Sequence, residues 1–134
     1  MIKKEEIKDE DSVFRRVPHW NWDLDNDCAD AKAFDDPKMS VDWDKYSTLE
    51  ETAARAGQAR DGTKFGAVTL RVGFLRKPDT GKPDRSQDVI HDPQEENPAH
   101  SLVIGEKGLK LGRRISKHAK SLKTIAPVAK TRSF

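Results

Sequence analysis

Alternating apolar and polar residues predict several short β-strands in this chain. Residues 13–17 form the first, which stops before Pro18 because proline cannot donate to a strand ladder. Residues 39–43 alternate with a period of two, which turns Met39, Val41 and Trp43 toward the core. Three further runs predict strands of a mostly antiparallel sheet: residues 65–75, 88–91 and 102–104.

Two other segments have helical patterns. Ser47 and Glu50 have the spacing of a capping box, which predicts a short helix that continues through Ala56 and ends at Gly57. After residue 108, apolar positions recur every three or four residues opposite a basic face, which predicts an amphipathic helix. The expected fold class is therefore α+β: a small, mostly antiparallel sheet with one short helix and one basic C-terminal helix.

A length of 134 residues fits one domain. We expect this domain to span residues 13–125, between a flexible charged N-terminus at 1–12 and a flexible basic tail at 126–134. With 34% hydrophobic and 36% charged residues, the core should be small and its edges well solvated.

Charge is unevenly distributed along the chain. The net charge is only +2, but the segment from Glu106 to Phe134 contains nine basic residues and one acidic residue, and the rest of the chain is acidic. Such a segment either binds polyanions or folds back on its own domain. The apolar stripe of the predicted helix favours the second reading.

The cysteine count and the lengths of the apolar runs limit the location and the chemistry that we expect for the protein. Cys28 is the single cysteine, so an intramolecular disulfide and a cysteine-built zinc site are excluded. No apolar run approaches the roughly 20 residues that cross a bilayer, and the first residues lack the apolar centre of a signal peptide. We expect a cytoplasmic protein that needs no membrane, resident metal or cofactor.

Residues 23–36 are rich in aspartate and begin like a calcium loop. Cys28 stands where such a loop needs glycine, and Phe34 stands where it needs a bidentate glutamate. The segment is therefore no calcium hand. A loose divalent site and a solvated acidic loop both remain open.

His91 and His100 are the strongest candidates for chemistry, because a hairpin between them would bring two imidazoles to one edge with Asp88 or Asp92 as orienting group. The pair would act as acid and base, or would hold a metal ion together with a carboxylate. The alternative is two surface histidines, with His100 bonding a backbone carbonyl. Arg15 and Arg16 must face opposite ways in their strand, and Arg16 would clamp an anion if it points toward His100.

Further residues are expected to contribute to ligand binding. Asn97 lies in the turn before His100, and Lys107 lies in a glycine-flanked helix entry that can offer amides to an anion. The basic face of the predicted helix carries Arg113, Arg114 and Lys117. It predicts at most weak, salt-sensitive binding of nucleic acid, since no nucleic-acid motif accompanies it.

Residues 13–18, 36–41 and 92–105 together resemble a family of short uncharacterised bacterial proteins. The resemblance implies one compact domain and brings no activity with it. We therefore expect an accessory or interaction module that recognises a partner protein or an anionic ligand, using the His91/His100 edge, Arg16 and the basic helix. The alternative is a small enzyme acting on a nucleotide or phosphoester, with His100 and His91 as acid and base and Arg16 as anion clamp.

Overall fold

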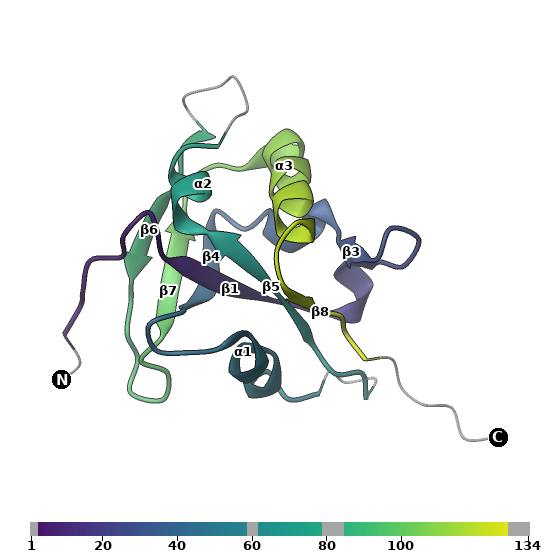
Figure 1. Cartoon of the computed structure of the whole chain (residues 1–134), viewed down its shortest axis with the longest axis horizontal. Coiled ribbons are helices and arrows are strands. Elements are labelled where there is room, and N and C mark those ends of the chain that lie inside the picture. Colours follow the sequence, from purple (N-terminus) through teal and green to yellow (C-terminus); the bar gives the residue numbers. More distant parts are fainter. Residues whose placement is uncertain (1–2, 59–61, 79–84, 129–134) are drawn as a thin grey trace.

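The computed structural model describes residues 3–58, 62–78 and 85–128 (Figure 1). Its elements follow in the order β1 Ser12–Val17, η1 His19–Asn21, β2 Trp22–Asp23, β3 Cys28–Ala29, η2 Ala31–Phe34, β4 Lys38–Trp43, α1 Leu49–Arg55, β5 Gly66–Arg71, α2 Val72–Arg76, β6 Asp88–His91, β7 His100–Ile104, α3 Gly108–Lys120 and β8 Thr124–Ile125.

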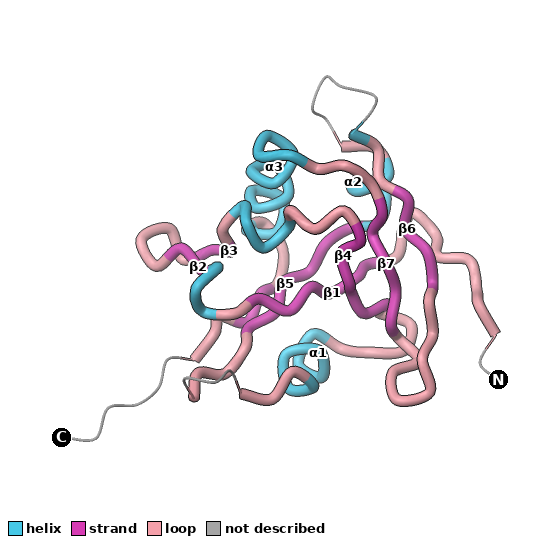
Figure 2. Tube along the Cα trace, turned by 180° about the vertical axis from the view of Figure 1, so that it is seen from behind, coloured by secondary structure: helices cyan, strands magenta, loops and turns pink. Residues whose placement is uncertain are grey.

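Six strands form one sheet in the order β6-β7-β4-β1-β5-β8, in which every neighbouring pair is antiparallel (Figure 2). β2 and β3 form a separate small hairpin. An antiparallel sheet with a few helices confirms the α+β class. Asp42 on β4 lies opposite His100 on β7, and Ser40 lies opposite Leu102, a register that places the candidate site described below.

α3 covers one face of the sheet, and α1 lies on the opposite side (Figure 1). α3 buries Leu111, Ile115 and Ala119 in the main core, which confirms that the basic segment packs on its own domain. Gly112 allows the close approach of α3 to η2, because a Cβ there would lie 3.0 Å from the carbonyl oxygen of Ala31. The loss of helix propensity at this glycine is therefore offset by packing.

The second face carries a smaller core under α1. Leu49 and Ala53 of α1 pack there with Phe14 and Ala67, so the helix covers β1, β5 and β8. Beside α1 a polar pocket opens over β4 and β7. The fold thus places one polar surface next to a helix that is anchored by only a few apolar side chains.

The cap of α1 differs by one residue from the sequence prediction. Thr48, and not Ser47, is the N-cap: its hydroxyl oxygen accepts from the Glu51 amide at 3.1 Å. Ser47 is buried and its hydroxyl bonds Thr52 at 3.1 Å. Both residues fit the capping pattern, and burial decides which one caps the helix.

The strand predicted over residues 65–75 is wrong in its second half, because the chain turns into α2 after Arg71. The amides of Val72 and Gly73 donate to the carbonyls of Asp11 and Asp9. A spacing of three residues then buries Val72 and Leu75 on one side of the short helix. The apolar run alone does not distinguish these two conformations.

The N-terminal segment, which was expected to be flexible, makes contacts with the rest of the domain. Ile7 is only 1% exposed and joins the main core, and the Glu5 amide donates to the His91 ring. A single apolar residue among many charges gave no periodic signal. At the other end, Val128 pairs with Lys64 through two backbone hydrogen bonds, and residues 129–134 lie outside the described part of the chain.

Candidate functional site

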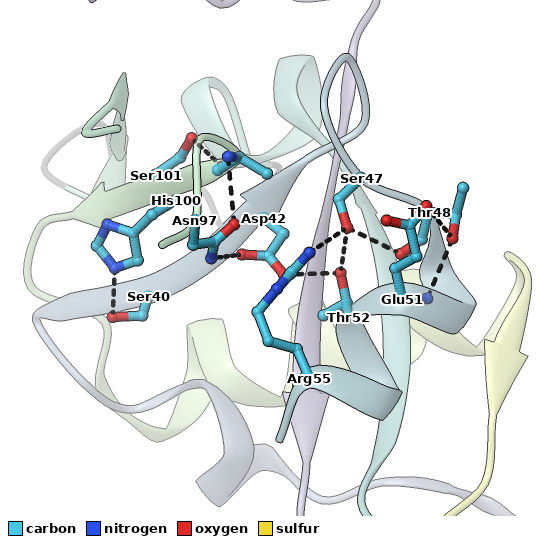
Figure 3. Close-up of polar contacts among 11 residues, drawn as sticks. Ser40, Asp42, Ser47, Thr48, Glu51, Thr52, Arg55, Asn97, His100 and Ser101 are labelled. Atoms are coloured by element: carbon cyan, nitrogen blue, oxygen red, sulfur yellow. Dashed lines mark hydrogen bonds and ion pairs between the residues drawn. The ribbon is translucent and has the colours of Figure 1, made fainter. Parts of the chain in front are cut away.

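A pocket of about 270 Å³ opens on the second face of the sheet, beside α1. Its walls come from β1, β4, β7, α1 and the turn that precedes β7. The polar side chains that the following argument uses are Arg16, Ser40, Asp42, Arg55, Asn97 and His100. Figure 3 shows all of them except Arg16.

Asp42 holds the base of the pocket together. Its Oδ2 accepts from the Thr52 hydroxyl at 2.8 Å and from Arg55 in an ion pair, and its Oδ1 accepts from Asn97 Nδ2 at 2.8 Å (Figure 3). Asp42 is only 7% exposed. One buried carboxylate therefore joins β4, α1 and the turn before β7, and it neutralises the Arg55 charge.

Asn97 lies in the pocket as the sequence predicted, but its side chain has a structural role. Its Nδ2 donates to Asp42, and its Oδ1 accepts from the Ala99 amide at 3.2 Å. These bonds shape the turn that carries His100. Asn97 therefore positions the pocket wall, with little hydrogen-bonding capacity left for a ligand.

His100 has a defined tautomer because of its partners. Its Nδ1 lies 3.0 Å from the Asp92 carbonyl oxygen and 3.1 Å from Asp92 Oδ2, and both oxygens can only accept from the ring. In the neutral ring the proton therefore sits on Nδ1, and Nε2 carries the lone pair. That lone pair faces the Ser40 hydroxyl at 3.3 Å (Figure 3). Asp92 is thus the orienting group that the sequence suggested.

Arg15 and Arg16 face opposite ways, as strand alternation requires. Arg15 donates to the backbone oxygens of Ala33 and Ser40. Arg16 is exposed, lines the pocket and lies 5.9 Å above the ring of Phe65. Within the described residues, Arg16 takes part in no ion pair, so its charge faces the pocket without a carboxylate partner.

His91 does not belong to this site, and the expectation that two imidazoles meet at one edge is wrong. His91 pairs with Ser101 in the ladder, so it points to the opposite face from His100. The ring is 2% exposed and packs between Trp43 and Tyr46. Its Nδ1 accepts from the Glu5 amide, which leaves Nε2–H to donate to the Pro98 carbonyl at 2.7 Å. Both nitrogens are occupied, and the histidine is structural.

Lys107 is also misassigned as a ligand-binding residue. The side chain is 2% exposed, and its Nζ donates to the carbonyls of Val103 and Gly105, each at 3.1 Å. Burial lowers the pKa of Lys107 to about 8. The ammonium therefore joins β7 to the start of α3 and offers no contact to a solvent-borne anion.

The basic helix face lies away from the pocket. Arg113, Arg114 and Lys117 are exposed on α3, across the sheet from α1 (Figure 1). None of the three forms an ion pair with another described residue. They therefore cannot act on the same small ligand as Arg16 and His100.

Sequence reasoning missed Ser40 and Arg55. A signal for Ser40 was present, because turning Met39 and Val41 toward the core necessarily turns Ser40 toward the other face. Arg55 offered no such signal, since its partner Asp42 is 13 positions away in the chain. Only the packing of α1 brings the two together.

Residues 23–36 form the β2–β3 hairpin and η2. Asp23 accepts from the Asn26 side chain and from two backbone amides, which lowers the pKa of its carboxyl group. Among the described residues, no three His, Cys, Asp or Glu side chains gather closely enough to hold a metal ion. The described helices are also too short or too polar to cross a membrane.

Comparison of the chain with known protein families, with curated proteins and with solved structures finds no match.

Proposed function

We propose that the protein is a binding module whose pocket recognises a compact anionic group, a phosphate or carboxylate, on a small ligand or a partner protein. The observation that carries the proposal is the exposed guanidinium of Arg16 in a pocket that also contains the Ser40 hydroxyl. A guanidinium binds phosphate and carboxylate through paired N–H donors. Ser40 adds a hydroxyl that donates or accepts.

The charges of the pocket select the kind of anion. Arg55 is neutralised by Asp42, which leaves Arg16 as the anchor. Glu96, exposed on the turn, lines the same pocket and repels a second negative group. One compact anion beside Arg16 therefore fits better than a chain of phosphates.

Binding of inorganic phosphate and of succinate, followed by calorimetry, tests the proposal. Arg16→Gln should weaken binding at least tenfold, because a charge-assisted hydrogen bond contributes about 1.5–3 kcal/mol. Arg113→Gln on α3 is the matched control and should leave the affinity unchanged. Equal affinities for the protein and for Arg16→Gln would contradict the proposal.

A further inference from the structure

We infer that Ser40, His100 and Asp92 form a hydroxyl-activating relay, and that the pocket hydrolyses small carboxylic esters that carry an anionic group. The substrate preference rests on the proposed function, since Arg16 would hold that anionic group. The nucleophile itself does not depend on Arg16.

The contacts of His100 supply the parts that such a relay needs. Asp92 fixes the proton on Nδ1 through two oxygens at 3.0 and 3.1 Å, and Nε2 lies 3.3 Å from Ser40 Oγ (Figure 3). A nucleophile bonded to a base that is itself oriented by a third group is the arrangement that activates serine. Ser40 is exposed and lines the pocket, so a substrate can reach it.

The sheet holds Ser40 and His100 in this relation. Asp42 pairs with His100 and Ser40 pairs with Leu102, so Ser40 and His100 are diagonal neighbours on one face of β4 and β7. β1 pairs with β4 only as far as Phe14, and Arg15 then donates to the Ser40 carbonyl at 2.8 Å. The main chain of the serine is thereby fixed, which favours a preorganised hydroxyl.

The reaction balances with water as the second substrate. Ser40 Oγ forms a bond to the ester carbonyl carbon while its proton moves to His100 Nε2. The bond from that carbon to the alkoxy oxygen breaks, and Nε2 returns the proton to the leaving alcohol. Water then loses a proton to Nε2 and attacks the acyl carbon of the acyl-serine. The bond from that carbon to Ser40 Oγ breaks and Nε2 returns its proton to Oγ, which releases the acid and restores the Ser40 hydroxyl.

Arg55 is the candidate donor to the oxyanion of these steps, because it lines the pocket that contains Ser40. A guanidinium has five N–H donors, and Asp42 and Ser47 each accept from one terminal nitrogen. Donors that are fixed before the reaction contribute strongly to acyl transfer.

Labelling with a fluorophosphonate tests the nucleophile, because this reagent phosphonylates an activated serine and releases fluoride. Mass spectrometry should locate the label on Ser40. His100→Gln should slow labelling at least 100-fold, since positioned bases contribute about 10²–10⁴-fold. Ser121→Ala, at an exposed serine after α3, should have no effect. Absence of the label from Ser40, or equal labelling rates with and without His100, would overturn the inference.

Hydrolysis of two p-nitrophenyl esters separates the nucleophile from the anion anchor. The protein should prefer the anionic succinate monoester to the neutral acetate, and Ser40→Ala should abolish both activities. Arg16→Gln should lower kcat/KM for the succinate ester at least tenfold relative to kcat/KM for the acetate, which removes the preference for the anionic ester. If hydrolysis requires Ser40 but Arg16→Gln leaves the preference for the succinate ester unchanged, the relay is supported and the anion anchor is refuted. Phosphate binding that depends on Arg16, without Ser40 labelling, would refute the relay and leave the anchor intact.

Discussion

At the scale of single residues, the structure separates side chains that build the fold from those that are available for chemistry. His91, Asn97 and Lys107 look reactive in the sequence, yet their polar atoms are largely satisfied by backbone and side-chain partners. Arg16 and His100 face a pocket. The difference lies in strand register and burial, which residue type alone does not encode.

The Asp42 network predicts a large effect of a small substitution. Asp42→Asn removes the charge that pairs with Arg55 and should lower the free energy of unfolding by about 2–3 kcal/mol, because a half-buried guanidinium loses its partner. Urea unfolding measures the change. Asp88→Asn, at an exposed position on β6, is the control and should change stability by less than about 0.5 kcal/mol. Equal effects of the two substitutions would contradict this role of Asp42.

Lys107 predicts a pH dependence of stability. Its pKa falls from 10.5 to about 8 on folding, so between these values the unfolded chain binds more protons than the folded one. The free energy of unfolding contributed by Lys107 therefore rises with pH from about 8 to 10.5, by at most about 3 kcal/mol. Lys107→Met should remove this rise in urea unfolding measured across the window. A rise of the same size in the variant would show that other groups cause it.

At the scale of elements, sequence patterns predicted most strands and helices correctly. β1, β4, β6, β7 and α3 fall within a few residues of their expected positions, because alternation or helical spacing is clear in each. The start of α2 was missed since backbone groups of Asp9 and Asp11, distant in the chain, capture the amides of Val72 and Gly73. Local pattern carries no information about such partners.

The cap of α1 gives a test at this scale. Thr48→Ala removes the hydroxyl that accepts from the Glu51 amide and should cost about 1 kcal/mol of stability. Thr48→Ser keeps the hydroxyl and should cost at most a few tenths of that amount. The comparison by thermal unfolding identifies Thr48 as the cap; equal losses in the two variants would argue that packing of the threonine methyl group is responsible.

At the scale of the whole molecule, the sheet separates the Arg16 side chain from the basic face of α3. Arg16 lines the pocket beside α1. α3, which carries the basic residues, lies on the opposite side of the sheet from α1 (Figure 1). The sequence hypothesis combined His100, Arg16 and the basic helix in one recognition surface. That combination is wrong, because the pocket and α3 lie on opposite sides of the sheet. The order of elements along the chain does not indicate which face each one covers.

This separation predicts independent binding behaviour. Replacing Arg113, Arg114 and Lys117 with glutamine should reduce the steepness of the salt dependence of duplex DNA binding, by up to about 2.7 in the slope of log K against log salt if all three contact phosphates. The affinity for inorganic phosphate at the pocket should not change. Filter binding and calorimetry measure the two quantities, and a parallel loss of both would contradict two separate sites.

The most direct test of the central claim, that Arg16 anchors an anion in the pocket that His100 lines, is a phosphate titration followed by nuclear magnetic resonance. Saturable shifts should appear at the Arg16 and His100 side chains and at the backbone of Ser40, with the α3 residues unaffected. Arg16→Gln should abolish the shift at His100. Shifts confined to α3, or a His100 response that persists without Arg16, would contradict the account.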